Sequence, residues 1–337
     1  MVWSEIVPAQ PPPPGPASPT TVAPPYPSSV AFGRSLVDEL ATHVVGRRRE
    51  IEQLVAALSA GRHLLLEGPP GTGKSTLLRA VADAGGHGFE FVEGNAELTP
   101  ARMVGTFDPS AVLESGYSPD VFLDGPLTAA LRDGSLLYIE EINRIPEETL
   151  NVLITVMSEG ELHIPRLGHV VAHSGFRLVA AMNPFDAIGT ARISGAVYDR
   201  VCRLAMGYQE RPDELAIVAR RSSGVRTAAD PEFLARAVEM VRATRSHPDL
   251  RTGSSVRGAI DFTLLSAGLA DLRECGFTDQ GVTLDAAQLA LSGRVRVRDG
   301  CGRSAEEIVQ ELWRRFFETT AGDVAPGAAP EGEPGKA

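Results

Sequence analysis

The chain has 337 residues, 43% hydrophobic and 22% charged, which suffices for one large domain or two smaller ones with buried cores. Its formal net charge of −11 argues against nucleic acid as a partner, because phosphate backbones are bound by basic surfaces. The three cysteines form no CxxC pair, no apolar run approaches the ~18 residues of a membrane span, and no signal-peptide pattern opens the chain. We therefore expect a cytoplasmic protein without membrane insertion.

Both ends of the chain are rich in proline, glycine and other small residues. Each proline fixes φ and removes a backbone donor, so the segment "PAQPPPPGPASPTTVAPPYPSS" favours neither a helix nor a central strand. We predict a disordered arm over residues 1–30 and a disordered tail over residues 321–337. A docking role for the arm is an alternative to a plain solvated segment.

Between residues 31 and 210, short apolar runs alternate with segments of helical spacing. Such alternation predicts an α/β domain with a parallel sheet covered by helices on both faces. The expected strands are "HLLLE" (63–67), "FEFVEG" (89–94), "SLLYIEE" (135–141) and "FRLVAAMN" (176–183), and the expected helices are "EIEQLVAALSAG" (50–61), "KSTLLRAVADAGG" (74–86) and "PEETLNVLITVMSEG" (146–160).

From residue 211 the pattern becomes helical, which predicts a second, all-helical domain over residues 211–320. Its expected helical runs are "PDELAIVARRS" (212–222), "PEFLARAVEMVRATRS" (231–246), "SVRGAIDFTLLSAGLADLREC" (255–275), "LDAAQLALSGRVRV" (284–297) and "AEEIVQELWRRFF" (305–317).

A phosphate-binding pattern, G-x-x-x-x-G-K-[ST], lies directly after the strand at 63–67 and opens the helix at 74–86. Glycines let backbone N–H groups close around phosphates, and the helix N-terminus favours negative charge. Lys74 is expected to reach the β and γ phosphates, and Ser75 to offer its hydroxyl to Mg²⁺. The predicted nucleotide-binding residues of this loop are Gly68, Pro69, Pro70, Gly71, Thr72, Gly73, Lys74, Ser75 and Thr76.

Two adjacent carboxylates end the apolar run "LLYIEE". Taken alone, they are consistent with a polar strand end. A phosphate-binding loop, however, works with a partner strand that carries an acid for magnesium. We therefore predict that Glu140 takes part in holding Mg²⁺ and that Glu141 is the base that orients the attacking water.

The motifs "GPPGTGKS", "LLYIEEINRIPEETLNVLITVMSEGEL", "FRLVAAMNP", "AVYDRVCRLAM" and "GSSVRGAIDF" occur in the order found in MoxR-type AAA+ ATPases. The chain resembles this family over residues 36–318, and "GPLTAALRDGSLLYIEEINR" is similar to its CbbQ/NorQ branch. The resemblance implies a P-loop AAA+ nucleotide-binding domain with a helical lid. It also implies a homo-oligomeric ring, usually a hexamer, with ATP between subunits. The family commonly has Asp where this chain has Glu140.

The resemblance assigns further roles by position. Asn183 corresponds to the polar sensor beside the γ-phosphate, although an Asn before Pro184 also suits a turn. Arg200 corresponds to the arginine offered to the neighbouring subunit, with an ion pair to Asp199 or Glu210 as the alternative.

Two more positions follow from the same resemblance. Arg257 corresponds to a second sensor that reaches the phosphates from the lid, and the alternative is an arginine lying on a helix face. Val45 and Gly46 correspond to the segment that passes the adenine. The arginines that follow, residues 47–49, are interpreted as a solvated face.

Two stretches resemble family insertions. The segment "GTFDPSAVLESGYSPDVFLDGPL" (105–127) precedes the strand of Glu140, and "ELHIPRLGHVVAHSGF" (161–176) alternates around Leu167-Gly168 like a hairpin. In the family such hairpins handle the client protein. The histidines of this stretch (His163, His169 and His173) are interpreted as exposed hairpin residues rather than as a metal cluster.

These features favour a mechanochemical ATPase that needs ATP and Mg²⁺ and remodels a protein client, usually together with a partner that carries a von Willebrand A domain. A nucleotide-gated scaffold with little or no turnover is the alternative, and Glu140 in place of Asp favours it. A small-molecule kinase leaves Arg200 and Arg257 unexplained, and a nucleic-acid motor disagrees with the acidic charge.

Overall fold

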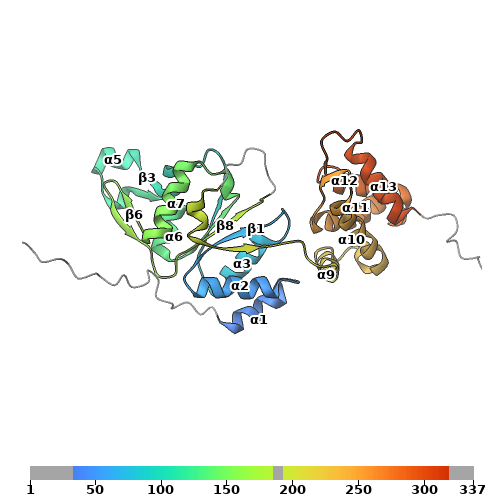
Figure 1. The fold of residues 1–337 in the computed structure, drawn as a ribbon, viewed down its shortest axis with the longest axis horizontal. Coiled ribbons are helices and arrows are strands. Elements are labelled where there is room, and N and C mark those ends of the chain that lie inside the picture. Colours follow the sequence, from blue (N-terminus) through green and yellow to red (C-terminus); the bar gives the residue numbers. More distant parts are fainter. Residues whose placement is uncertain (1–32, 185–192, 319–337) are drawn as a thin grey trace, which may run out of the picture.

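The computed structural model describes residues 33–184 and 193–318; the predicted arm and tail lie outside the described residues. Figure 1 shows two lobes, a sheet covered by helices and a lobe built almost entirely of helices, joined through the segment that enters α9 (Arg211–Arg221). Within the described residues, no helix combines the length and the apolar character needed to cross a membrane.

A five-stranded parallel sheet forms the first lobe, and the predicted α/β class is confirmed. The strand order is β2-β5-β8-β1-β9, in which β9 is an edge strand that the sequence analysis did not include. Leu204 is the buried residue of β9, and this weak apolar signal explains the omission. The strands are β1 (His63–Glu67), β2 (Phe89–Glu93), β5 (Leu136–Glu140), β8 (Arg177–Met182) and β9 (Val201–Ala205).

Parallel pairing brings the carboxyl ends of the central strands to one edge of the sheet. Glu67, the last residue of β1, pairs with Met182 of β8 and Ala205 of β9, and Glu140 of β5 pairs with Glu93 of β2. Ligands of such sheets bind beyond this edge. The phosphate-binding loop, the paired glutamates and Asn183 therefore leave the sheet on the same side.

Helices cover both faces because side chains alternate along each central strand. On β1, Leu64 and Leu66 pack into a core with the first three helices, whereas Leu65 packs into the core of the opposite face. The helices of the first lobe are α1 (Arg34–His43), α2 (Arg48–Ser59), α3 (Lys74–Gly85), α4 (Pro100–Val104), α6 (Pro126–Asp133), α7 (Glu147–Glu159) and α8 (Gly195–Tyr198), with the single turns η1 (Pro119–Val121) and η2 (Ile142–Arg144).

Both predicted insertions carry antiparallel hairpins. The first contains β3 (Gly105–Phe107) and β4 (Phe122–Asp124) on either side of α5 (Pro109–Ser115), and the second is the predicted hairpin of β6 (Glu161–Ile164) and β7 (Gly168–Val171). The two insertions meet where the Arg166 guanidinium lies 3.8 Å from the centre of the Tyr117 ring.

The hairpin histidines form no metal cluster within the described residues. The rings of His163 and His169 lie 4.7 Å apart, and His169 Nδ1 lies 3.5 Å from a carboxylate oxygen of Glu161. His173 lies outside the two strands, where its Nδ1 accepts a hydrogen bond from the backbone of Gly175.

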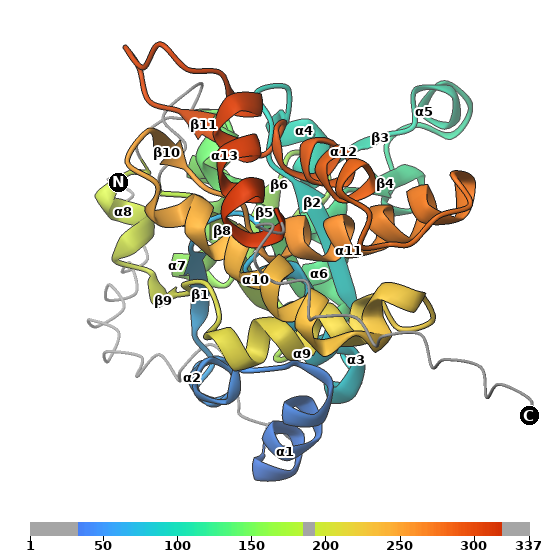
Figure 2. The same ribbon diagram turned by 90° about the vertical axis from the view of Figure 1, so that its right-hand side faces the viewer.

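The second lobe is a helical bundle with its own core, shown in front of the sheet in Figure 2. Phe233 stacks on Phe262 and meets the edge of Phe317. The bundle contains α9, α10 (Pro231–Ser246), α11 (Val256–Leu272), α12 (Gln280–Leu291), α13 (Ala305–Phe317) and the turn η3 (Arg226–Ala229). The exact domain boundaries at residues 31, 210, 211 and 320 stay a prediction.

One expectation for this lobe was wrong. The run at 284–297 does not continue as a helix: α12 ends at Leu291, and residues 296–297 form β11 (Arg296–Val297), which pairs with β10 (Leu250–Thr252). The sequence "RVRV" alternates with a period of two, which is the period of a strand. The lobe is therefore helical with one small antiparallel sheet, and this sheet borders the cavity described below.

Candidate nucleotide site

The phosphate-binding loop lies between β1 and α3, where the sequence predicted it. Gly71 and Gly73 have φ values of 76° and 86°, a left-handed conformation that glycine adopts readily. Gly68 must also lack a side chain, since a Cβ there would lie 2.1 Å from the backbone oxygen of Met206. The loop is therefore fixed by close backbone packing on one side and turns that need glycine on the other.

Lys74 begins α3 and is 8% exposed. Its Nζ donates hydrogen bonds to the carbonyl oxygens of Gly68 (2.8 Å) and Pro69 (3.0 Å). Burial lowers the pKa of this ammonium group, and the carboxylate of Glu140 opposes the shift. The loop carbonyls thus hold the Lys74 ammonium inside the curve of the loop, where an incoming phosphate would meet it.

The two predicted magnesium residues lie side by side. Ser75 Oγ donates a hydrogen bond of 3.1 Å to Glu140 Oε1, and it also lies 3.2 Å from the hydroxyl of Tyr138. Burial raises the pKa of the Tyr138 hydroxyl, which keeps it protonated. A hydroxyl and a carboxylate oxygen beside a phosphate-binding loop are the hard ligands that Mg²⁺ prefers, so these residues fit the metal that the sequence implies.

Glu141 follows directly and has a φ of 53°, which is uncommon for a residue with a side chain. Its carboxylate forms an ion pair with Arg144 at 3.0 Å. The backbone at this point is held by Gly94, whose N–H donates to the Glu140 carbonyl at 2.7 Å and whose missing Cβ leaves room for the Glu141 carbonyl. Backbone strain of this kind is concentrated at functional positions.

Asn183 and Arg257 come from different lobes and line one cavity beside Pro69, Pro70 and Gly71. Asn183 follows β8, and Arg257 lies in the first turn of α11. The lobes touch here, since a Cβ on Gly71 would lie only 2.2 Å from Ser255 Oγ. The two predicted sensors therefore face the same space next to the loop.

A second cavity of about 350 Å³ lies on the other side of the loop. Val45, Ile217 and Ile260 give it apolar walls, and Gly73 and Thr76 of the loop close one end. Val45, which the family resemblance assigns to the adenine, lines this cavity, and its contact with adenine stays a prediction. Gly46 has a φ of 67° and packs so closely that a Cβ would lie 2.3 Å from the Asp213 carboxylate, so its contribution is to backbone shape.

Arg47 does not belong to a solvated face, and that expectation was wrong. Its guanidinium is 3% exposed and donates hydrogen bonds to the carbonyls of Thr72 (3.1 Å) and Gly207 (2.5 Å). It also forms an ion pair with Glu50 at 2.6 Å. Arg48 and Arg49 are exposed as expected. Arg47 fastens the phosphate-binding loop to the segment that enters the second lobe.

Arg200 lines neither of these cavities. Its Nη1 donates to the carbonyl of Ala196 at 2.8 Å, and its Nε donates to Ser158 Oγ. Among the described residues it has no carboxylate partner, so the alternative of an ion pair with Asp199 or Glu210 is wrong. The guanidinium lies between α7 and α8, away from the loop of its own chain.

Glu67, which the sequence analysis missed, connects the loop with the segment of Arg200. Its carboxylate is almost fully buried at the end of β1, where it accepts hydrogen bonds from the Tyr198 hydroxyl (2.8 Å) and from the Arg203 guanidinium. A glutamate that ends the apolar run "HLLLE" was the available signal.

Comparison with known proteins found one matching family model and several similar proteins. A family model described as AAA domain (dynein-related subfamily) matches residues 63–201. The uncharacterized protein YeaC of Bacillus subtilis is 29% identical over 304 residues, 82% of this chain and 91% of that protein. The gas vesicle ATPase GvpN of Ancylobacter aquaticus is 29% identical over 226 residues, which cover 62% of each chain. A RuvB mutant of Thermotoga maritima gives a TM-score of 0.49 at 20% identity, covering 75% of this chain and 72% of that one.

The contacts of Arg47 generate the first testable prediction. Arg47→Ala removes two hydrogen bonds from a charged donor, each worth about 1.5–3 kcal/mol, and releases the backbone at Thr72. We expect ATP affinity to fall by about tenfold or more, as measured by titration with a fluorescent ATP analogue. Arg49→Ala is the matched control, because Arg49 is exposed two residues away. Equal affinities of the two variants would contradict the assignment.

Proposed function

Because the chain is an AAA+ ATPase of the MoxR type, we propose that it hydrolyses ATP with Mg²⁺ in a homo-oligomeric ring, a hexamer, and remodels a protein client. One observation carries the proposal: Lys74, Ser75, Glu140 and Glu141 meet at the carboxyl edge of the sheet, and the lid residue Arg257 faces the same loop. In this combination, the residues at the sheet edge would bind the phosphates and support hydrolysis, and the second lobe would sense the nucleotide through Arg257.

In this proposal the nucleotide spans the loop. The β and γ phosphates lie against the backbone N–H groups of the loop and replace carbonyls as partners of the Lys74 ammonium. The adenine occupies the 350 Å³ cavity between Val45 of the first lobe and Ile217 and Ile260 of the second. ATP then contacts both lobes, so its binding and loss change how they are held together.

Ser75 and Glu140 would hold Mg²⁺ through the oxygens that now share a hydrogen bond. When bound, the ion would neutralise charge on the β and γ phosphate oxygens. Glu140 is one methylene longer than the Asp of the family, yet it reaches Ser75 Oγ. It is therefore a workable substitute, and this geometry favours an active enzyme over the scaffold alternative.

Glu141 is the proposed base. Its carboxylate orients a water molecule and accepts a proton from it as the water oxygen attacks the γ-phosphorus and ADP leaves. Asn183, at the end of β8, is proposed to hold the same water or a γ-phosphate oxygen. Arg257 is proposed to reach the γ-phosphate from the lid and to stabilise the charge that develops there.

Arg200 is proposed to act on the neighbouring subunit. It lies away from its own loop, and it is joined to the end of β1 through Tyr198 and Glu67. An arginine supplied by a neighbour would make each active site depend on assembly. The nucleotide state of one loop would also reach, through Glu67, the arginine that serves the next subunit.

The client side of the proposal rests on the two insertions joined by Arg166 and Tyr117, which stand out from the sheet. By family resemblance, we propose that they handle a protein client together with a partner that carries a von Willebrand A domain. Among the relatives, three are named gas vesicle ATPases, so an assembly of proteins is a fitting class of client. We also propose a cytoplasmic location, where ATP is available.

The paired glutamates give the second testable prediction. Glu141→Gln keeps the side-chain shape and removes the base, so ATP should bind as before while phosphate release falls by about 10²-fold or more. Glu140→Ala should reduce turnover at low Mg²⁺, with partial recovery at high Mg²⁺. Glu140→Asp is the control and should remain active. Normal turnover of Glu140→Ala at low Mg²⁺ would show that Glu140 is only a polar strand end.

Arg200 gives the third prediction. Arg200→Ala should bind ATP normally and hydrolyse it about 10³-fold more slowly, the lower end of the effect of arginine fingers. Mixing it with Lys74→Ala subunits should restore part of the activity, because some interfaces pair an intact loop with an intact arginine. Phosphate release is measured after co-assembly has been verified by light scattering. Co-assembled rings without any recovery would assign Arg200 a role within its own subunit.

A further inference from the structure

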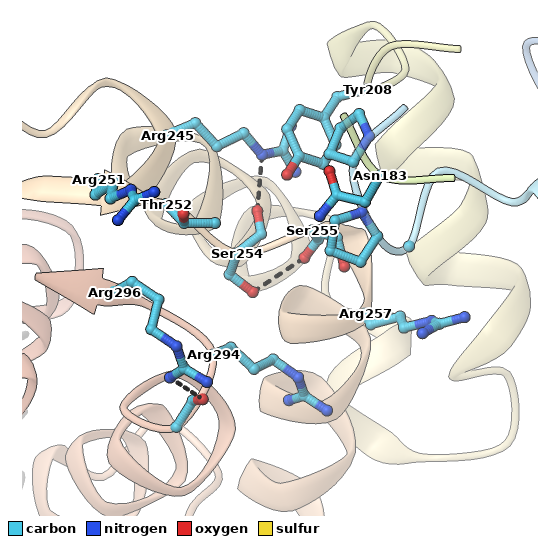
Figure 3. A pocket seen from close by; sticks show the side chains of 15 residues that line it. Asn183, Tyr208, Arg245, Arg251, Thr252, Ser254, Ser255, Arg257, Arg294 and Arg296 are labelled. Atoms are coloured by element: carbon cyan, nitrogen blue, oxygen red, sulfur yellow. Dashed lines mark hydrogen bonds between the residues drawn. The ribbon is translucent and has the colours of Figure 1, made fainter. Parts of the chain in front are cut away.

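A cavity of about 620 Å³ lies between the phosphate-binding loop and the second lobe, and one wall of it is built from arginines. Pro69, Pro70, Gly71 and Asn183 form the wall on the side of the first lobe. Figure 3 shows the arginines of the second lobe that line this space, with Arg245 beside Tyr208 and near Asn183. They come from α10, β10, α11 and the segment through β11, and they are Arg245, Arg251, Arg257, Arg294 and Arg296.

The positive charge of this wall is only partly neutralised. Arg245 forms an ion pair with Glu214 at 2.7 Å, and Arg294 forms one with Asp261. Among the described residues, Arg251, Arg257 and Arg296 have no carboxylate within ion-pair distance, and no Asp or Glu lines the cavity. A cavity lined by one sign of charge concentrates the electrostatic potential inside it. In a chain of net charge −11, this cavity is a local region of positive charge.

The chemistry of the wall indicates the class of anion. Guanidinium groups match the geometry of phosphate oxygens through paired N–H donors. The hydroxyls of Thr252 and Ser255 add further donors. We propose that this cavity binds phosphate oxyanions, and that its occupant during turnover is the inorganic phosphate released at the adjoining loop. This assignment of the occupant rests on the proposed ATP hydrolysis.

Position favours the product phosphate over other anions. The cavity and the proposed adenine cavity share Gly71 and Arg257, so they meet at the loop. Asn183, which faces the proposed γ-phosphate position, lines the arginine cavity and not the proposed adenine cavity. Phosphate that leaves the loop on this side therefore enters a region of positive charge directly.

A phosphate held here would contact both lobes. The loop residues belong to the first lobe and the arginines to the second, and the two already touch at Gly71 and Ser255. The bound anion would hold the lid against the loop after cleavage, and its loss would free the lid. Release of phosphate, rather than cleavage, would then set the moment at which the lobes separate.

Direct binding tests the site without requiring turnover. Inorganic phosphate is titrated by calorimetry, at low ionic strength, into the full-length protein saturated with ADP. We expect R251Q/R296Q to bind phosphate about tenfold more weakly or worse than the unmodified protein, since hydrogen bonds from charged donors are lost. R314Q/R315Q, which removes two exposed arginines of the same lobe on α13, is the matched control and should bind normally.

The source of the phosphate is tested in a single turnover of ATP. We expect release, followed with a fluorescent phosphate sensor, to lag behind cleavage, followed by acid quenching, and the lag to shorten in R251Q/R296Q. If tripolyphosphate binds through these arginines while release keeps pace with cleavage in both proteins, the product-phosphate assignment is overturned.

Equal phosphate affinity in R251Q/R296Q and the control, or binding of an acidic peptide but not of phosphate, overturns the anion class. A protein that binds phosphate through Arg251 and Arg296 but cleaves no ATP supports the site and overturns only the proposed function.

Discussion

Parallel pairing of β1, β5 and β8 is the constraint on which the candidate site depends. Because these strands run in one direction, the residues that end or directly follow them, Gly68, Glu140 and Asn183, leave the sheet at one edge although they are distant in the sequence. The phosphate-binding loop can then turn into α3 directly beside the carboxylates. The hydrogen bond between Ser75 and Glu140 depends on this alignment, since its two residues are 65 positions apart.

Arginine organises the rest of the site. Of the 32 lysine and arginine residues of the chain, all but two are arginine, whose planar guanidinium never loses its proton near neutral pH. Arg47 fastens the loop to the segment that enters the second lobe. Arg203 and Glu67 connect the end of β1 with the segment of Arg200, and a row of arginines in the second lobe faces the loop across the larger cavity. Charged side chains of both lobes therefore lie around the position where the γ-phosphate is proposed to be cleaved.

Local patterns predicted the parts of this site that are contiguous in the sequence. The loop at 68–75 was predicted because its glycines, its lysine and its flanking strand and helix are all local. Glu140 was predicted because it ends an apolar run beside such a loop, and Asn183 from the family resemblance. Arg47 was misinterpreted, since three successive arginines do not reveal which one a distant carbonyl at Gly207 will bind. The arginine cavity was missed for the same reason: its members are spread over some fifty residues and meet only after α10, α11 and β11 have packed. The β10–β11 sheet was missed because its strands are very short. Hydrophobic periodicity over so few residues does not distinguish a strand from the end of a helix.

Covalent labelling tests most directly the central claim that ATP binds with its phosphates on Lys74. The chain has two lysines, Lys74 and Lys336, so the site of acylation can be assigned by mass spectrometry without ambiguity. ATP that carries a reactive acyl group on its terminal phosphate transfers that group to a lysine beside the phosphate, and the lowered pKa of Lys74 favours the reaction. The account predicts that Lys74 is acylated and that excess ATP protects it, while Lys336 is labelled weakly and without protection. Labelling of Lys74 that is no greater than that of Lys336 and is unaffected by ATP would contradict it.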